Sequence, residues 1–176
     1  LIEKLSYSYP CFIIYNFILN NFEGTLDLGN CNLRSQDLNK GKDGKNEYNL
    51  YDLLKFIKNK ITILNLGPDY LSSKVMKISE STNNDGCNYF ESFDPIDLSV
   101  FINLKEVHLR KCNLNTMPFF GSKEKSSTSK NYPKLELIDV SINNIKKFDF
   151  YTKSTSKLTL RAQSNKCRNL KIDATE

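Results

Sequence analysis

His108 is the only histidine in the 176-residue chain, and histidine is the side chain best suited to proton transfer near neutral pH. As a catalytic base it would need a nucleophile within reach and an acidic group to orient its ring. Asp139 could lie beside it on a neighbouring strand, but no Ser or Cys at an activated turn completes the set. We therefore expect a cross-strand ion pair between His108 and Asp139 rather than a catalytic site.

The other residues with potential chemistry are five cysteines, an odd number without a CxxC pair. Cys87 follows Asp85-Gly86, and no second ligand with the spacing of a zinc site stands near it. The chain also has no glycine-rich loop of the kind that holds phosphate groups. These observations predict a non-enzymatic protein with no catalytic residue, no metal site and no cofactor.

Regularly spaced apolar residues are the most informative pattern in the chain. One segment follows the spacing L-x-x-L-x-L-x-x-N/C-x-L with Leu104, Val107, Leu109, Cys112 and Leu114. A second segment, 31 residues later, repeats it with Leu135, Ile138, Val140, Asn143 and Ile145. Apolar residues at every second position place one side of a short strand in a core, and such a strand cannot bury that side alone.

This spacing resembles the leucine-rich repeat, in which each repeat is one strand and one return path of a stacked solenoid. Two earlier segments share it: Leu26, Leu28, Cys31 and Leu33, then Leu64, Leu66, Asp69 and Leu71, where Asp69 takes the Asn position. The resemblance covers about residues 22–172. It implies an α/β leucine-rich-repeat solenoid, with a short parallel β-sheet on the concave side and helices or loops on the convex side.

The predicted organisation is an N-terminal helical cap over residues 1–21 and four to five irregular repeats over residues 22–176. Pro10 suits the first turn of a helix that continues through the apolar residues to Leu19. Helices are also expected from Glu47 to Lys60 and, within an insert-bearing return path, from Asp94-Pro95 onward. The strands are 38, 43 and 31 residues apart, and inserts account for the excess over the usual length.

Two registers are open for the last repeat, after Ile145. In one, Leu158-Thr-Leu160 is the fifth strand and Gln163 takes the Asn position. In the other, Cys167, Leu170 and Ile172 supply the repeat, and residues 157–162 form a strand on the convex side. The second register is preferred because its 32-residue spacing matches the preceding 31 residues.

Residues between the repeated leucines point away from the core and are predicted to form the partner-binding concave face. These are Asp27, Ile63, Asn65, Glu106, His108, Arg110, Leu137 and Asp139. The set is mixed in charge, and the apolar Ile63 and Leu137 stand on either side of Glu106. A polar surface with two apolar anchors suits a protein partner better than a phosphate backbone.

The formal charge of +5 is a mild excess, and the lysines are interleaved with acids and loop residues instead of forming a dense stripe. Binding of nucleic acid is therefore not expected. The repeat positions of Cys31 and Cys112 require reduced thiols, and no N-x-S/T acceptor is present, which predicts a cytoplasmic or nuclear location. The apolar run Pro10–Leu19 is too short to span a bilayer, so no membrane association is expected. Since the chain begins with Leu1 and not with an initiator methionine, we expect it to begin inside a longer protein or after trimming.

The leading functional hypothesis is a non-enzymatic scaffold that recognises a protein partner of unknown identity through the concave sheet. One alternative is the substrate-receptor subunit of a ubiquitin ligase, because Leu1–Pro10 is similar to the middle of an F-box, although the opening Leu-Pro and the later Val-Cys-x-x-Trp of that module are missing. Another alternative is a subunit of an RNA-processing or chromatin assembly.

Leu109 tests the assignment of inward positions. Leu109→Ala should leave a cavity in the core and lower the free energy of unfolding by about 2–5 kcal/mol. Denaturant unfolding of the wild type and the variant measures this difference. If the two proteins unfold at the same denaturant concentration, the assigned repeat positions are wrong.

Overall fold

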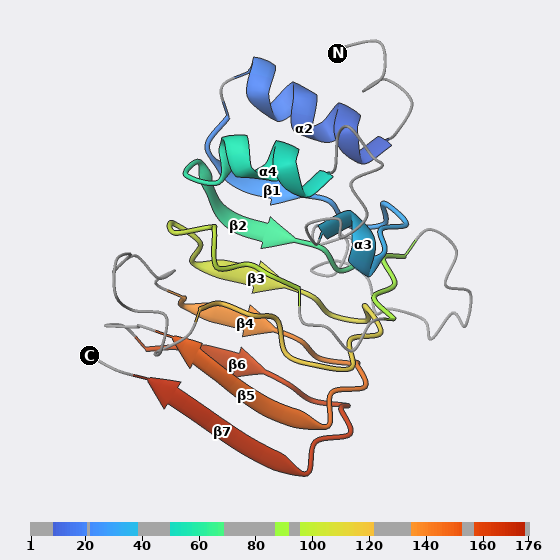
Figure 1. Ribbon diagram of the computed structural model, residues 1–176, viewed down its shortest axis with the longest axis vertical. Coiled ribbons are helices and arrows are strands. Elements are labelled where there is room, and N and C mark those ends of the chain that lie inside the picture. Colours follow the sequence, from blue (N-terminus) through green and yellow to red (C-terminus); the bar gives the residue numbers. More distant parts are fainter. Residues whose placement is uncertain are drawn as a thin grey trace, which may run out of the picture.

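The computed structural model describes residues 9–20, 22–38, 50–68, 87–91, 96–121, 135–152 and 157–174. These residues form a mixed α/β structure with a parallel β-sheet and few helices (Figure 1). The helices are α2 (Tyr9–Leu19), α3 (Ser35–Leu38) and α4 (Leu50–Ile57). Among the described residues, no helix is both long and apolar enough to cross a membrane. Most of the F-box-like stretch, residues 1–8, lies outside the described residues.

Five strands form one parallel sheet in the order β1-β2-β3-β4-β6. Their bounds are β1 (Gly24–Asp27), β2 (Ile61–Asn65), β3 (Glu106–His108), β4 (Leu137–Asp139) and β6 (Thr159–Arg161). The register aligns the inward residues Leu26, Leu64, Val107, Ile138 and Leu160 in a single row across the sheet. Each successive strand of this sheet is therefore added at the same edge, as Figure 1 shows.

A second, two-stranded parallel sheet pairs β5 (Lys147–Thr152) with β7 (Asn169–Ala174). Its strands run opposite to β4 and β6, so the chain reverses direction after each of these two strands (Figure 1). Phe148 on β5 is 1% exposed and belongs to the same core as the five-stranded sheet. The last two return paths are therefore strands, where the earlier ones contain helices or irregular segments.

One continuous apolar core extends from α2 to β5. The inward side chains of the four complete repeats are almost fully buried, as the alternating pattern predicts. At the β1 end of the sheet, Ile14 and Phe17 of α2 are buried in this core. The helix expected in the N-terminal segment is thus present, and it covers the end of the core where no strand precedes β1 among the described residues (Figure 1).

Two expected helices differ from the structure. The helix predicted over Glu47–Lys60 is observed as α4, Leu50–Ile57, followed by a turn; residues 39–49 lie outside the described part of the chain. The helix predicted from Asp94-Pro95 is not formed in its described part, where Asp97 pairs with Phe119 in a parallel bridge. The Asp97 carboxylate accepts the backbone N–H of Ser99 at 3.0 Å, and this local turn competes with helical hydrogen bonds.

The preferred register of the last repeat is wrong. Leu160 pairs with Ile138 in the five-stranded sheet, whereas Leu170, predicted to be inward, is 66% exposed on β7. The alternative that placed a fifth strand at Leu158–Leu160 is correct about the strand but shifted by two residues in register: β6 spans Thr159–Arg161, Leu160 pairs with Ile138, and the Asn position is Asn165 and not Gln163. The residue spacing was misleading because the return path from β4 to β6 contains the strand β5 and is shorter than the insert-bearing return paths before it.

Asn143 shows what the Asn position of the repeat does. Its Nδ2 atom donates to the carbonyl oxygens of Leu109 and Val140, which follow neighbouring strands, each at 2.8 Å. Its Oδ1 atom accepts the backbone N–H groups of Cys112 and Leu114 at 3.0 and 2.9 Å. One buried amide therefore satisfies backbone groups of two adjacent repeats, which would otherwise lie unpaired in the core.

Asn165 and Asn88 make equivalent hydrogen bonds at the Asn positions after β6 and β2. Asn165 Nδ2 donates to the carbonyl oxygens of Val140 and Ala162, at 2.8 and 3.0 Å. Asn88 Nδ2 donates to the carbonyl oxygens of Leu28 and Leu66, at 2.8 and 2.7 Å. Together with Asn143, these side chains form what we call the asparagine ladder.

Asn88, and not Asp69, fills the Asn position of the second repeat. Asn143 and Asn165 bond to a carbonyl three residues before them, but the equivalent bond of Asn88 reaches back 22 residues to Leu66. The insert therefore lies inside the repeat pattern, between its strand and its asparagine. Phe90, which is 1% exposed, then takes the apolar position that was assigned to Leu71. Residues 69–86 themselves lie outside the described part.

The turn before each Asn position requires an unusual backbone. Asn30, Lys111, Ile142 and Ser164 occupy equivalent positions in four repeats, and their φ angles lie between 53° and 57°. This left-handed conformation disfavours side chains with a branched Cβ, so Ile142 is the most strained of the four. The recurrence of the same turn in four repeats shows that the backbone path, and not only the apolar spacing, is repeated.

Asn88→Ala tests the position of the insert. The substitution removes a buried amide that satisfies two carbonyls and one N–H, so we expect the free energy of unfolding to fall by about 1–3 kcal/mol or more. Asp69→Ala is the matched comparison, since spacing alone assigns the position to Asp69. Denaturant unfolding measures both variants. A larger loss for Asp69→Ala than for Asn88→Ala would contradict this assignment.

Candidate functional site

The candidate site is the face of the five-stranded sheet that points away from the core. Two rows of side chains run across it, one residue from each strand. The first row consists of Thr25, Ile63, Glu106, Leu137 and Thr159. The second row consists of Asp27, Asn65, His108, Asp139 and Arg161. Seven of the eight predicted partner-binding residues therefore lie in these rows, and Arg110 follows β3.

The second row does not form the exposed surface that the sequence pattern predicts. Asn65, His108 and Asp139 are 1%, 7% and 6% exposed, so the middle of the row is buried. Asp27 is half-buried and Arg161 is exposed at the two ends of the row. Four residues of this row, Asp27, Asn65, His108 and Asp139, were predicted to offer their side chains to a partner. That prediction is wrong for the three buried ones.

Local hydrogen bonds explain the burial of the acidic and amide side chains in this row. Oδ1 atoms of Asp27, Asn65 and Asp139 each accept the backbone N–H two residues later, at 2.9, 3.1 and 3.0 Å. Such bonds bend the side chain back onto its own strand end and stop the strand there. The pattern Asp/Asn-x-Gly/Ser, present at all three places, was the sequence signal for this structural role.

The same side chains are also linked across the strands. Asn65 Nδ2 donates to Asp27 Oδ1 at 2.8 Å. Ser141 Oγ donates to Asp139 Oδ1 at 2.6 Å, and Arg161 lies 3.9 Å from Asp139 Oδ2. These carboxylate and amide groups are therefore already hydrogen-bonded or ion-paired within the protein.

His108 is paired with a different acid from the one expected. Its Nε2 atom lies 3.2 Å from Glu106 Oε2, two residues earlier on the same strand. Asp139, the predicted cross-strand partner, is instead engaged by Ser141 and Arg161. No hydrogen bond joins the Ser141 hydroxyl to His108, so these three residues do not form the relay that a serine nucleophile requires.

The first row is the accessible part of this face. Ile63, Glu106 and Leu137 are half-buried and adjacent in the register, so an acidic group lies between two apolar side chains. Thr25 and Thr159 are exposed at the two ends. We call Ile63, Glu106 and Leu137 the central triplet. Of the predicted residues, these three and Asp27 keep both the predicted position and partial access to solvent, and Arg110, which follows β3, is also half-buried.

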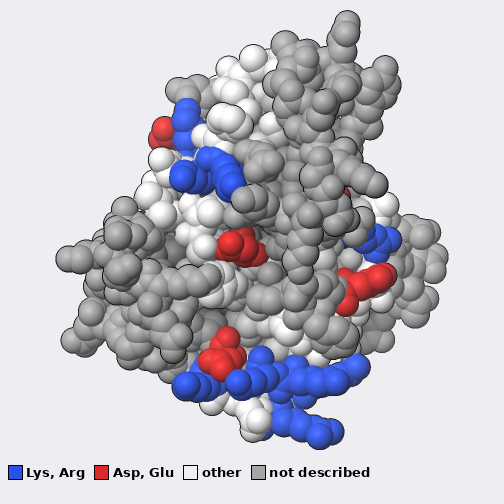
Figure 2. All heavy atoms as spheres, in the orientation of Figure 1, with Lys and Arg blue, Asp and Glu red and all other residues white. Residues whose placement is uncertain are grey.

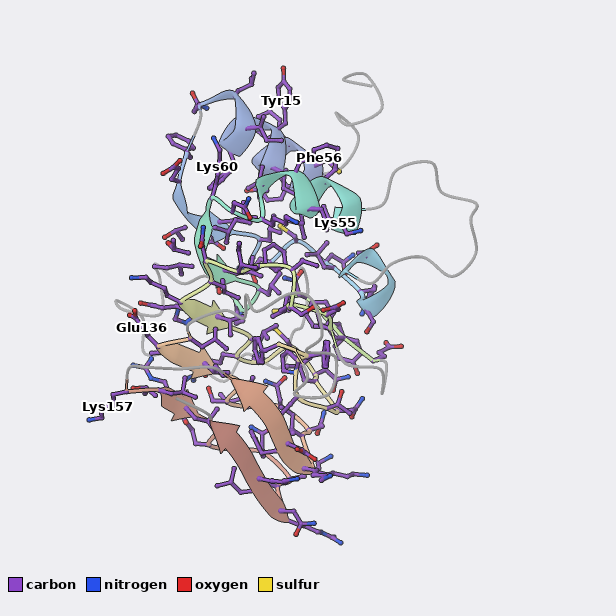
Figure 3. All side chains as sticks on the ribbon, turned by 60° about the vertical axis from the view of Figure 1, so that its left-hand side comes forward. Tyr15, Lys55, Phe56, Lys60, Glu136 and Lys157 are labelled. Carbon is purple, nitrogen blue, oxygen red and sulfur yellow. The ribbon has the colours of Figure 1, made fainter. Side chains whose placement is uncertain are left out.

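Charged side chains border this face where the strands begin. Lys60, Glu136 and Lys157 project from the same side of the molecule, near the starts of β2, β4 and β6 (Figure 3). Lys105 Nζ lies 3.4 Å from Glu136 Oε1, and both of these side chains are exposed. Exposed pairs of this kind contribute little to stability, so this pair can exchange with charges on another molecule at little cost.

The described residues offer no grouping of three or more His, Cys, Asp or Glu side chains that could hold a metal ion. Burial, and to a smaller extent the charge of Asp27, raises the pKa of Cys31 to about 11. Burial also raises the pKa of Cys112 strongly. Both thiols therefore stay protonated at neutral pH, and they donate weak hydrogen bonds to the carbonyls of Gly29 and Leu66.

Asp139→Ala distinguishes a structural role from a recognition role for the second row. The change leaves the buried N–H and hydroxyl of Ser141 without their acceptor, so the free energy of unfolding should fall by about 1–3 kcal/mol. Arg161→Ala removes only the exposed ion pair with Asp139 and should cost about 0–1 kcal/mol. Urea unfolding measures both. Equal losses would mean that Asp139 does not hold the end of β4.

No protein-family model, curated protein or solved structure matches this chain. Its function must therefore be inferred from its own residues. The features available for that inference are the half-buried central triplet, the charged border of the sheet and the buried polar network beneath them.

Proposed function

We propose that this chain is a leucine-rich-repeat solenoid of irregular, insert-bearing type, and that it acts as a non-enzymatic module for recognising a protein partner. The observation that carries the proposal is the central triplet, in which Ile63 and Leu137 flank Glu106 on the outward face of the five-stranded sheet.

The solenoid part of the proposal is supported by three features that recur at the same repeat positions. Inward apolar residues form one row, left-handed turns follow the strands, and the asparagine ladder joins one repeat to the next. Five strands are paired in parallel and in chain order. Stacked repeats share a continuous core, and each repeat contacts only its neighbours.

Protein recognition is supported by the chemistry of the accessible row. An interface needs apolar anchors that lose water on binding and polar groups around them that fix orientation. Ile63 and Leu137 provide the apolar groups. Glu106, Arg110 and the exposed Arg161 provide charges of both signs around these anchors.

The non-enzymatic part of the proposal rests on the state of the reactive groups. The Ser141 hydroxyl is bound to Asp139, and the buried Cys31 and Cys112 thiols are held in their unreactive protonated form. His108 Nε2 lies 3.2 Å from Glu106 Oε2, in an ion-pair arrangement on its own strand. These groups serve the fold.

We also propose an intracellular location. The five cysteines are all free, and Cys112 contributes its thiol as a hydrogen-bond donor to Leu66 at 3.2 Å inside the core. A thiol used in this way must remain reduced, which is the state maintained in the cytosol and nucleus.

Replacing both apolar anchors by acids tests the recognition surface. The partner is first obtained by affinity purification with the full-length protein, and its dissociation constant is then measured with both proteins purified. We expect Ile63→Asp with Leu137→Asp to weaken binding by about tenfold or more, since anchors dominate interface energy. Glu106→Lys reverses the charge between the two anchors and also removes the carboxylate that contacts His108, and it should weaken binding as well.

Leu170→Asp is the matched control, because it makes the same type of change at an exposed residue of the other sheet. Circular dichroism of each variant establishes that it is folded. If the purified partner binds the double variant and Glu106→Lys as tightly as the wild type, recognition does not take place on this face.

A further inference from the structure

The end of the molecule that β5 and β7 form is strongly basic. Between residues 146 and 174, the described chain contains Lys146, Lys147, Lys157, Arg161, Lys166, Arg168 and Lys171. The acidic residues in the same part are Asp149 and Asp173. Figure 2 shows Lys and Arg side chains gathered at the lower end of the molecule, where Figure 1 places β5 and β7. The charge of the chain is thus more concentrated than its sequence suggests.

Three of these cations surround one hollow. Lys146, Lys166 and Arg168 line a cavity of about 250 Å³, and we call it the cationic pocket. All three residues are exposed, and none forms an ion pair with another described residue. Unpaired like charges around one hollow repel one another, and a bound anion would relieve that repulsion.

The neighbouring acid does not neutralise the cationic pocket. Asp149 Oδ2 lies 2.7 Å from Lys147 Nζ, so its charge is already paired. The hydrogen bond from Lys147, together with the charges of Lys147 and Lys171, lowers the pKa of Asp149. This acid is therefore fully ionised and compensated by lysines that do not line the pocket.

Backbone and side-chain amide hydrogen bonds fix the main chain that carries the three cationic residues. Arg168 N–H donates to the carbonyl oxygen of Lys146 at 3.0 Å, which makes these two residues neighbours on adjacent strand starts. Lys166 directly follows Asn165, whose amide is bound to the carbonyls of Val140 and Ala162. A site whose backbone is fixed before binding loses less conformational entropy when a ligand arrives.

We propose that the cationic pocket binds the phosphate group of a phosphorylated side chain on a protein partner. A phosphate ester carries nearly two negative charges and three acceptor oxygens at neutral pH, which suits three cationic donors. The guanidinium of Arg168 can bind two of those oxygens at once, and the two lysines supply point charges. This inference rests on the proposed function only in that the phosphate is carried by a protein.

The size and surroundings of the pocket favour a single phosphate group. Pockets that hold whole small-molecule ligands measure about 300–1,000 Å³, so a hollow of 250 Å³ suits a compact group instead. Single-stranded nucleic acid is bound through aromatic platforms along a basic groove. The exposed aromatic side chains that the structure describes are Tyr9, Phe12, Phe22 and Phe56, at the opposite end of the molecule near α2 and α4.

Binding of a phosphopeptide to the isotope-labelled chain tests the proposal. The probe is Gly-Gly-phosphoserine-Gly-Gly with blocked ends, and backbone amide shifts are followed by NMR. We expect saturable shifts at Lys146, Lys166 and Arg168 that weaken as salt is added. The double variant Lys166→Ser with Arg168→Ser should bind at least about tenfold more weakly.

Lys171→Ser is the matched control, because it removes one exposed cation of the same basic end, on β7, that does not line the pocket, and it should leave the affinity unchanged. The amide spectra also show whether each variant keeps its fold. The proposal is overturned if the phosphopeptide gives no saturable shift at the pocket, or if the same peptide with Glu in place of phosphoserine binds equally well. Tighter binding of a ten-nucleotide oligothymidine, with shifts beyond the pocket, would overturn it in favour of nucleic acid.

This experiment needs no partner protein, so its result is independent of the sheet-face variants. Loss of partner binding in the Ile63 and Leu137 variant leaves the phosphopeptide result unchanged. Conversely, a negative phosphopeptide result leaves the assignment of the central triplet intact. The two proposals can therefore fail separately.

Discussion

The asparagine ladder is the interaction on which the rest of this structure depends. Each strand of the large sheet ends by turning away, and the turn leaves backbone carbonyls inside the core, where an unpaired group is costly. Asn88, Asn143 and Asn165 each bridge carbonyls of two successive repeats. Cys112 makes a weaker version of the same contact with one thiol donor. The packing of each strand segment against the next therefore depends on polar groups as well as on apolar burial.

The sheet could be predicted from the sequence because period-two alternation is a direct consequence of strand geometry. Leu64, Val107 and Ile138 had to share a face, and they do. The position of Asn88 could not be predicted in this way. A hydrogen bond depends on distance in space, and an insert between Leu66 and Asn88 changes the count of residues without changing that distance. The same limitation misplaced the last Asn position, which is Asn165 and not Gln163.

The sequence indicates which side chains of the sheet leave the core, but not which of them are exposed to solvent. Alternation shows which side chains leave the core, but not whether they then bond to their own strand. Asp27, Asn65 and Asp139 do so, since a short acceptor two residues before a free N–H closes a local ring. Ile63 and Leu137 lack such groups and keep partial access to solvent. The outward face thus contains one row whose side chains end the strands and one row that stays partly accessible to solvent.

The two proposed contact regions would contribute different kinds of interaction to binding, one apolar and one electrostatic. Burial of Ile63 and Leu137 provides apolar contact that is insensitive to salt, whereas the cationic pocket provides attraction that salt screens. The pocket lies where the chain turns from the large sheet into β5 and β7, and Asn165 fixes that turn. Asn165 of the asparagine ladder thereby fixes the backbone next to Lys166, one of the three residues that line the pocket. Recognition that depends on phosphate would in this way draw its rigidity from the same interaction that stacks the repeats.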